Sequence, residues 1–234
     1  MVSAVQAREV DLAGHPGLLL KPRRAEALYV LAHGAGAGMR HAFMVEIAEA
    51  LAERGIATLR WEFPYMAAGK ARPDPAPKAE AAVREVWNAS ATHAKGLPRF
   101  AGGKSFGGRM TSRSHAAEPL AGLCGIVFLG FPLHPPEKPG VERAEHLANA
   151  AGPLLFLQGT RDDLADLALL RPEIAKLGDR ATLHVVEGAD HGFDVLVRSG
   201  RTHDEVLDEL AETIAGWISS AACGRVTPRD TRRS

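Results

Sequence analysis

Two patterns of apolar residues alternate along the chain. Short continuous apolar runs are typical of strands buried on both faces of a sheet, and apolar residues that recur every three or four positions are typical of amphipathic helices. Helical patterns follow most of the runs, and the last helix starts with the capping box Thr202-x-x-Glu205. The runs predict strands at 27–32, 56–61, 99–104, 125–129, 153–157 and 181–186.

The alternation of strands and helices predicts an α/β fold. Strands that are apolar on both faces favour a mostly parallel central sheet with helices on both sides. We expect a single domain over residues 1–222, because neither a repeat nor a composition change marks a second one. Residues 223–234 are rich in arginine and poor in apolar side chains, which is typical of a disordered basic tail.

Turn and loop signals refine this picture. A hairpin is expected within residues 1–24, with its turn at 14–17, and the proline-rich segment 64–78 is expected to be a solvent-side loop. The segment before the strand at 153–157 offers only one short helix, at 142–150. A site at this end of the sheet is therefore expected to have a minimal cap or none, and to be fairly open.

Composition excludes several classes of protein. The 234-residue chain is 46% hydrophobic, enough for one sizeable core, and its 28 basic and 28 acidic residues balance. The N-terminus lacks a signal-peptide pattern, and no apolar run approaches the length of a bilayer span. We expect a soluble, cytoplasmic protein with no nucleic-acid or membrane partner. Cys124, which lies in an apolar run, is expected to be a buried free thiol.

The segment Gly103-Lys104-Ser105-Phe106-Gly107 carries the pattern Gly-x-Ser-x-Gly between a predicted strand and a predicted helix. In a nucleophile elbow this pattern holds a serine at the tip of a strained turn. The positions two before and two after the serine are expected to crowd against each other, and both are glycines here. We identify Ser105 as the candidate nucleophile.

Candidate partners for this serine follow two later strands. A serine hydroxyl needs a general base within hydrogen-bond reach, and the base needs a carboxylate that fixes its tautomer. Asp162 follows the strand at 153–157, and His191 follows the last strand. Both should lie at the carboxyl edge of the sheet, where open α/β sheets form their sites. Asp163 is expected to cap the next helix, and Asp166 is a weaker alternative acid.

An oxyanion intermediate would need preorganised backbone donors. The N–H of Phe106 stands directly after the serine at a helix N-terminus, and the N–H of Ala35 lies in the glycine-rich loop after the first buried strand. Gly103-Lys104-Ser105 resembles the end of a phosphate-binding loop, but Pro98 stands where that loop requires a glycine. The ten histidines show no metal-binding spacing. We therefore predict no cofactor and no metal.

Residues around the elbow receive weaker assignments. Lys104 is expected to make surface or ion-pair contacts. Arg109, one helical turn further on, is expected to pair with a carboxylate. Two interpretations stay open for Leu133 and His134. They either line an acyl pocket or are turn residues of a proline-rich loop.

Six segments together resemble a known superfamily, namely residues 33–38, 60–65, 102–109, 130–136, 158–162 and 188–191. The chain is similar to the α/β-hydrolases, within them to the dienelactone-hydrolase-like branch, and more narrowly to small bacterial hydrolases related to the testis-expressed group of α/β-hydrolase-like proteins. This resemblance implies the α/β-hydrolase fold. Characterised dienelactone hydrolases use a cysteine where Ser105 stands. The resemblance therefore implies esterase chemistry rather than a dienelactone substrate.

Together, the residues and the resemblance predict a serine hydrolase of the carboxylesterase type. Its partners would be a small-molecule acyl substrate and water. Two other hypotheses stay open: a non-catalytic interaction module that keeps the fold, and an acyltransferase or peptidase that uses the same three side chains. The substrate and the oligomeric state are not predicted.

Overall fold

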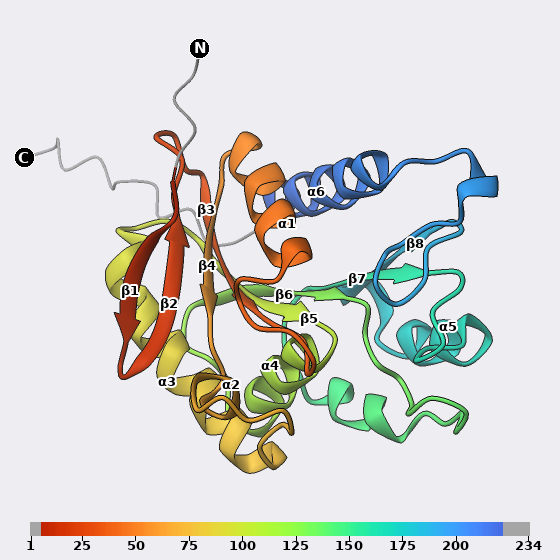
Figure 1. Ribbon diagram of the computed structural model, residues 1–234. Helices are drawn as coiled ribbons and strands as arrows, with labels where there is room; N and C mark the ends of the chain where they lie inside the picture. Colours follow the sequence, from red (N-terminus) through yellow and green to blue (C-terminus); the bar gives the residue numbers. More distant parts are fainter. Residues whose placement is uncertain (1–5, 222–234) are drawn as a thin grey trace, which may run out of the picture.

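One eight-stranded sheet runs through the computed structural model, which describes residues 6–221 (Figure 1). Its strands are Arg8–Leu12 (β1), His15–Leu20 (β2), Ala27–Ala32 (β3), Ile56–Trp61 (β4), Arg99–Lys104 (β5), Leu123–Leu129 (β6), Leu154–Gly159 (β7) and Ala181–Val186 (β8). They lie in the order β1-β2-β4-β3-β5-β6-β7-β8. β1 and β2 form an antiparallel hairpin, β2 pairs antiparallel with β4, and all neighbours from β4 to β8 are parallel.

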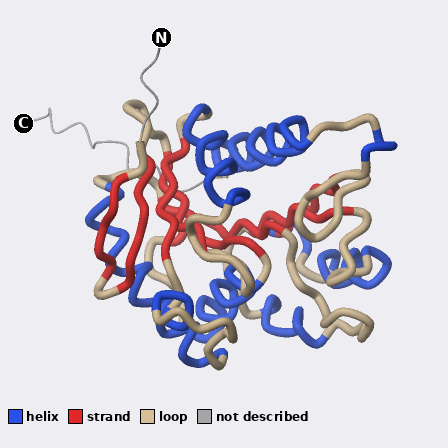
Figure 2. The backbone as a smooth tube through the Cα atoms, viewed as in Figure 1, coloured by secondary structure: helices blue, strands red, loops and turns tan. Residues whose placement is uncertain are grey.

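Helices cover both faces of the sheet (Figure 2). The α-helices are Ala42–Glu53 (α1), Pro64–Ala67 (α2), Ala76–Ala94 (α3), Phe106–Ala117 (α4), Leu167–Ala175 (α5) and His203–Ser220 (α6). Short 3₁₀ helices span Glu142–Ala148 (η1), Gly178–Arg180 (η2) and Val197–Ser199 (η3). α1 and α6 pack together on one face, whereas the other helices that contribute to the core, α2 to α5 and η1, lie on the opposite face.

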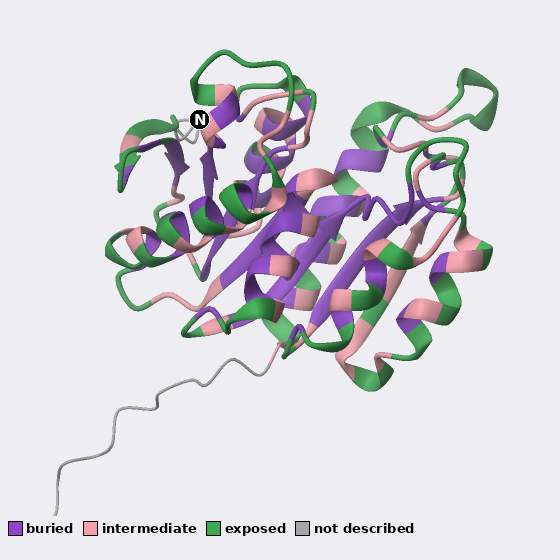
Figure 3. Ribbon diagram, turned by 90° about the horizontal axis from the view of Figure 1, so that it is seen from below, coloured by how far each residue is buried: buried purple, intermediate pink, exposed green. Residues whose placement is uncertain are grey.

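The buried strands follow from the apolar runs in the sequence. In β3, Tyr29 and Leu31 pack into the cluster that contains α1 and α6, while Leu28 and Val30 pack toward α3. Each strand residue therefore meets a helix on one face or the other. Figure 3 shows the result, with buried strands between helices whose outer sides are exposed. The predicted α/β-hydrolase fold, with its mostly parallel sheet, is confirmed.

The carboxyl ends of the parallel strands meet at one edge of the sheet. The chain leaves this edge in four loops that matter for the site: 33–41 after β3, the elbow after β5, 160–166 after β7, and 187–202 after β8. Crossover connections place these loops side by side although they are far apart in the sequence. The topology of the backbone alone therefore places the candidate residues near one another.

Some local predictions differ from the structure. The hairpin turns at Ala13–Gly14, where both φ angles are positive, and not at 14–17. The segment predicted as a loop at 64–78 begins with α2, because Pro64 fits the first turn of a helix and Tyr65 is fully buried. The short helix expected at 142–150 is η1, a 3₁₀ helix.

Two sequence predictions concern the chain ends and Cys124. Cys124 is buried in β6 and is disulfide-bonded, so the predicted free thiol is wrong. The predicted tail at 223–234 lies outside the described residues. Within residues 6–221, no helix combines the length and the apolar character needed to cross a membrane.

Candidate active site

Ser105 occupies a strained turn between β5 and α4. Its φ of 48° and ψ of −114° are rare for a residue with a side chain. A Cβ on Gly103 would lie 2.1 Å from the carbonyl oxygen of Ala32, and one on Gly107 would lie 2.6 Å from that same oxygen. Both glycines are therefore required by the close approach of β3. The nearest atoms to both positions belong to the end of β3, a contact that the sequence analysis did not predict.

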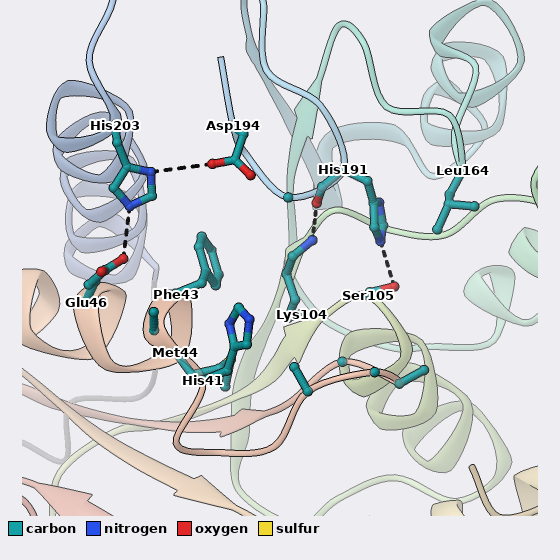
Figure 4. A pocket seen from close by; sticks show the side chains of 16 residues that line it. His41, Phe43, Met44, Glu46, Lys104, Ser105, Leu164, His191, Asp194 and His203 are labelled. Carbon is teal, nitrogen blue, oxygen red and sulfur yellow. Dashed lines mark hydrogen bonds and ion pairs between the residues drawn. The ribbon is translucent and has the colours of Figure 1, made fainter. Parts of the chain in front are cut away.

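The structure brings Ser105, His191 and Asp162 into one hydrogen-bonded chain. His191 Nε2 lies 2.8 Å from Ser105 Oγ, and His191 Nδ1 lies 2.7 Å from Asp162 Oδ2 (Figure 4 draws the first of these). A carboxylate accepts only, so Nδ1 carries the proton and Nε2 is left to accept from the serine hydroxyl. This is the arrangement in which an imidazole can take a proton from serine.

The carboxylate of Asp162 is fully buried and held by several donors. Its Oδ2 also accepts a hydrogen bond from the Gln158 side chain, and its Oδ1 accepts one from the Leu164 N–H at 2.8 Å. Gln158 is fixed in turn, because its Oε1 accepts from the Phe131 N–H at 2.9 Å. The sequence reasoning did not assign this role to Gln158. A polar residue at the end of a buried apolar strand was the available signal.

The neighbouring acids take other roles. Asp163 is exposed, and the cap of α5 is Asp166, whose side chain accepts from the Ala168 N–H at 2.8 Å. The capping role expected of Asp163 therefore belongs to Asp166. Asp190 orders the loop that carries His191, since its Oδ1 accepts from the Gly192 N–H at 2.8 Å.

The loop after β3 reaches the nucleophile. A Cβ on Gly34 would lie 3.9 Å from the Ser105 Cβ, and Ala35 lines the same cavity as Ser105. Phe106 is the first residue of α4, where backbone N–H groups have no acceptor within the helix. The two residues predicted to supply oxyanion donors therefore lie on the two segments that flank Ser105.

A set of residues missed by the sequence reasoning holds this loop. His33 is fully buried, donates from Nδ1 to the Gly34 carbonyl at 2.7 Å, and accepts at Nε2 from the Phe63 N–H at 3.0 Å. Burial lowers the pKa of His33, which favours the neutral ring that these two bonds require. The Tyr65 hydroxyl donates to the Ala35 carbonyl at 2.9 Å.

The far end of the loop is hydrogen-bonded to residues at the end of β4 and just after it. The Glu62 carboxylate accepts from the Met39 N–H at 2.8 Å, and Arg60 donates to the Met39 carbonyl at 3.1 Å. Residues 60–65 are one of the segments that carry the family resemblance, and the sequence analysis assigned them no role. In the structure they support loop 33–39. That role depends on a contact between two separate segments, which single-sequence patterns do not reveal.

A cavity of about 510 Å³ opens beside Ser105 and His191 (Figure 4). Its walls are mostly backbone and apolar side chains, including Phe43 and Met44 of α1, with a polar side formed by His203 and its neighbours. Leu133 and His134 are not among the residues that line it. His134 instead accepts from the Asp166 N–H at 3.1 Å, so it is a turn residue of the proline-rich loop.

Lys104, the residue before the nucleophile, also lines this cavity. Its Nζ donates a hydrogen bond to the His191 backbone carbonyl and lies 5.1 Å from the centre of the Phe193 ring. Burial lowers the pKa of Lys104 to about 8, against the opposing effect of nearby carboxylates, chiefly Asp162. The expectation of a surface contact for Lys104 is therefore wrong.

Candidate metal ligands do not converge. Within residues 6–221 no group of three or more His, Cys, Asp or Glu side chains is arranged to hold a metal ion. Several histidines instead meet one carboxylate each. His15 lies 2.8 Å from Glu85, and His184 lies 2.7 Å from Glu209.

Three features together define an α/β-hydrolase fold: the strand order, the parallel direction from β4 to β8 and the elbow between β5 and α4. A family model described as "Alpha/beta hydrolase domain" matches residues 25–219. The chain belongs to this family.

Solved structures with the same fold cover nearly the whole chain. A dienelactone hydrolase from Anabaena variabilis is 19% identical, with a TM-score of 0.72 over 91% of this chain and 95% of that one. Est1E from Butyrivibrio proteoclasticus with bound ferulic acid is 18% identical, with a TM-score of 0.66 over 91% and 100%. A serine hydrolase without a lid from Xanthomonas campestris is 16% identical, with a TM-score of 0.66 over 94% and 95%.

Proposed function

We propose that this protein is a serine hydrolase that cleaves a carboxylic ester or a related small acyl substrate. The observation that carries the proposal is the continuous hydrogen-bonded chain from Ser105 Oγ through His191 to Asp162, at 2.8 and 2.7 Å. Membership of the hydrolase family and the fold shared with a solved serine hydrolase support it. The proposed nucleophile is Ser105, the base His191 and the orienting acid Asp162.

In the first half of the proposed reaction, Ser105 Oγ attacks the acyl carbonyl carbon while His191 Nε2 takes the hydroxyl proton. The carbonyl oxygen becomes an oxyanion, for which the N–H groups of Ala35 and Phe106 are the proposed donors. The intermediate then collapses, the bond to the leaving alcohol breaks, and His191 returns its proton to that alcohol. The product is an acyl-enzyme on Ser105.

Water completes the cycle. His191 Nε2 takes a proton from a water molecule, whose oxygen attacks the acyl carbon and forms a second tetrahedral intermediate. Cleavage of the bond to Ser105 Oγ, with proton return from His191, releases the carboxylic acid and restores the serine. Asp162 keeps its hydrogen bond to His191 Nδ1 and stabilises the imidazolium that forms twice in each turnover.

The cavity favours a small or extended acyl group. Its volume of about 510 Å³ lies within the range of small-molecule sites, and its apolar wall at Phe43 and Met44 suits a hydrocarbon acyl chain. The segment between β6 and β7 contributes only η1, so this segment forms no helical cap domain over the cavity. The lidless serine hydrolase from Xanthomonas campestris has the same fold, which supports an open site here.

The test is labelling by a fluorophosphonate probe, which reacts with an activated serine, together with hydrolysis of short p-nitrophenyl esters. We expect the wild-type protein to be labelled and active, Ser105→Ala to be neither, and the exposed control Ser199→Ala to match the wild type. A wild-type protein that is not labelled contradicts the proposal and favours the non-catalytic interaction module. Labelling without hydrolysis of esters, thioesters or lactones points to an acyltransferase or a peptidase.

A further inference from the structure

The guanidinium of Arg109, one helical turn along α4 from Ser105, has no partner among the residues that the structure describes. No hydrogen bond or ion pair joins it to the side chains or backbone of residues 6–221, and its Nε is buried. The sequence-based expectation of a carboxylate partner for Arg109 is therefore wrong. A half-buried charge without a partner is unfavourable, because burial removes hydration that nothing replaces.

Two further arginines lie around Arg109. Arg113 follows it by one helical turn and is paired with Glu80 of α3. Arg143 comes from η1, which packs beside α4. Within the described chain its guanidinium makes one hydrogen bond, a long one to the Pro132 carbonyl at 3.5 Å. Among the described residues, Glu80 is the one carboxylate whose charge is resolved as acting on Arg109, and it is already paired with Arg113. Positive charge is therefore in excess around Arg109.

The remaining titratable group of the cluster does not change this balance. His146 of η1 lies 2.7 Å from the Ser112 hydroxyl through its Nε2. Burial, with Arg113 and Arg109 beside it, lowers the pKa of His146 to about 4, so the ring is neutral at pH 7. Burial and the neighbouring arginines also lower the pKa of Arg109, to about 10, which is the expected effect of uncompensated like charges.

We propose that Arg109 and Arg143 form a binding site for a small oxyanion, a phosphate or carboxylate group, in contact with the start of α4. A guanidinium presents its donors in a planar fork that matches the oxygens of these anions. Arg109 supplies unused donors there, and Arg143 a weakly engaged guanidinium. The carboxylates of the protein do not neutralise the repulsion between these two guanidinium groups. An anion bound between them would offset it.

The proposed site is separate from the cavity beside the nucleophile. Neither Arg109 nor Arg143 lines that cavity, although the Arg109 N–H donates to the Ser105 carbonyl at 3.1 Å. The site therefore lies on the helix that carries the nucleophile without being part of the acyl cavity. Its occupancy does not depend on whether Ser105 is catalytic, so the proposal stands apart from the proposed function.

The test is calorimetric titration of the full-length protein with inorganic phosphate at constant ionic strength, and in a second arm with succinate. We expect saturable binding with one of the two anions, which identifies phosphate or carboxylate as the preferred group. Arg109→Met and Arg143→Met should each weaken that binding at least tenfold. The control Arg40→Met removes an exposed arginine that is paired with Glu9 and should bind like the wild type.

Thermal unfolding supplies a check on folding. Because Arg109 has no partner within the described chain, Arg109→Met should leave the midpoint of the anion-free protein unchanged or raise it. The preferred anion should raise the midpoint of the wild type and of Arg40→Met, but not of Arg109→Met. The proposal is overturned if the wild type binds neither anion. It is also overturned if Arg109→Met and Arg143→Met bind the preferred anion as tightly as the wild type does.

Discussion

The side chain of Lys104 donates a hydrogen bond from Nζ to the backbone carbonyl of His191. The residue directly before the proposed nucleophile therefore fixes the loop that carries the proposed base. Gly130 leaves the room for this contact, because a Cβ there would lie 3.1 Å from Lys104 Nζ and 3.3 Å from His191 Cε1. Lys104 is thus placed to act as a positioning residue that sets the Ser105–His191 distance.

Replacing Lys104 by methionine should separate catalysis from binding. The variant keeps a long side chain against Phe193 but loses the donor to the His191 carbonyl. A shift of about 1 Å in a reacting group costs on the order of 10²-fold in rate. We expect kcat on a short p-nitrophenyl ester to fall by about that factor with little change in KM, measured by steady-state kinetics.

Two comparisons make this prediction specific. The control Lys176→Met removes an exposed lysine paired with Glu173 on the last turn of α5, and it should keep wild-type kinetics. A Lys104→Met protein with unchanged kcat would show that the His191 loop is held without this bond. A rise in KM with unchanged kcat would instead assign Lys104 to substrate binding.

The buried ammonium of Lys104 should also make stability depend on pH. Burial lowers the pKa of Lys104 in the folded protein to about 8, from an ordinary value of 10.5. Between these values the unfolded chain holds a proton that the folded protein has released, so the contribution of Lys104 to the free energy of unfolding rises with pH. Below about pH 8 both states are protonated, and the full cost of burying the charge is present.

Comparison with Lys104→Met isolates this effect. The variant should be more stable than the wild type below pH 8, and the difference in unfolding midpoint should narrow as the pH rises from 8 to 10.5. Chemical denaturation at a series of pH values measures it. A difference that stays constant over this interval would mean that Lys104 is hydrated well enough to keep its ordinary titration.

Most of the fold could be predicted because each buried strand leaves a local mark. The run Ala27–Ala32 is apolar at every position since helices cover both faces of β3, and its predicted bounds equal the observed ones. The order of the strands across the sheet leaves no such mark. Nothing local in residues 27–32 indicates that β3 lies between β4 and β5.

The same distinction applies to the candidate site. Ser105, Asp162 and His191 could be proposed because each comes shortly after the end of a predicted strand. Gln158, which donates to Asp162, left only one signal, a polar residue at the end of a buried apolar strand. Tyr65 could not be proposed, because its role is a contact with the Ala35 carbonyl, 30 residues away in the sequence. Supporting residues of this kind are defined by tertiary structure alone.

The choice of Asp162 over Asp163 can be tested with a matched pair of variants. Both oxygens of Asp162 face donors, Oδ1 the Leu164 N–H and Oδ2 the side chains of Gln158 and His191. An asparagine amide would therefore turn its NH₂ toward a donor in either orientation. We expect Asp162→Asn to lower kcat by about 10⁴-fold, in line with loss of the correct histidine tautomer.

The control for this variant is its neighbour. Asp163 is exposed, and His191 Nδ1 bonds to Asp162 instead, so Asp163→Asn should keep wild-type kcat and KM for the same ester. Equal losses in the two variants would contradict the assignment of the acid. Circular dichroism spectra of both proteins check that the fold is retained.

Two glycines in helices should respond in opposite ways to the same substitution. A Cβ on Gly107 of α4 would lie 2.6 Å from the carbonyl oxygens of Ala32 and His33, whereas one on Gly216 of α6 would meet no atom within 4 Å. Gly216→Ala should therefore raise the free energy of unfolding by about 0.5–1 kcal/mol, the usual gain of alanine over glycine in a helix.

Gly107→Ala should lower the free energy of unfolding by about 1–3 kcal/mol, because backbone atoms of the end of β3 have to move. The same movement displaces the loop that begins at His33 and carries Ala35, so esterase activity should fall as well. Urea denaturation of the two variants beside the wild type measures both effects. Equal stabilisation by the two alanines would contradict the close contact between the start of α4 and the end of β3.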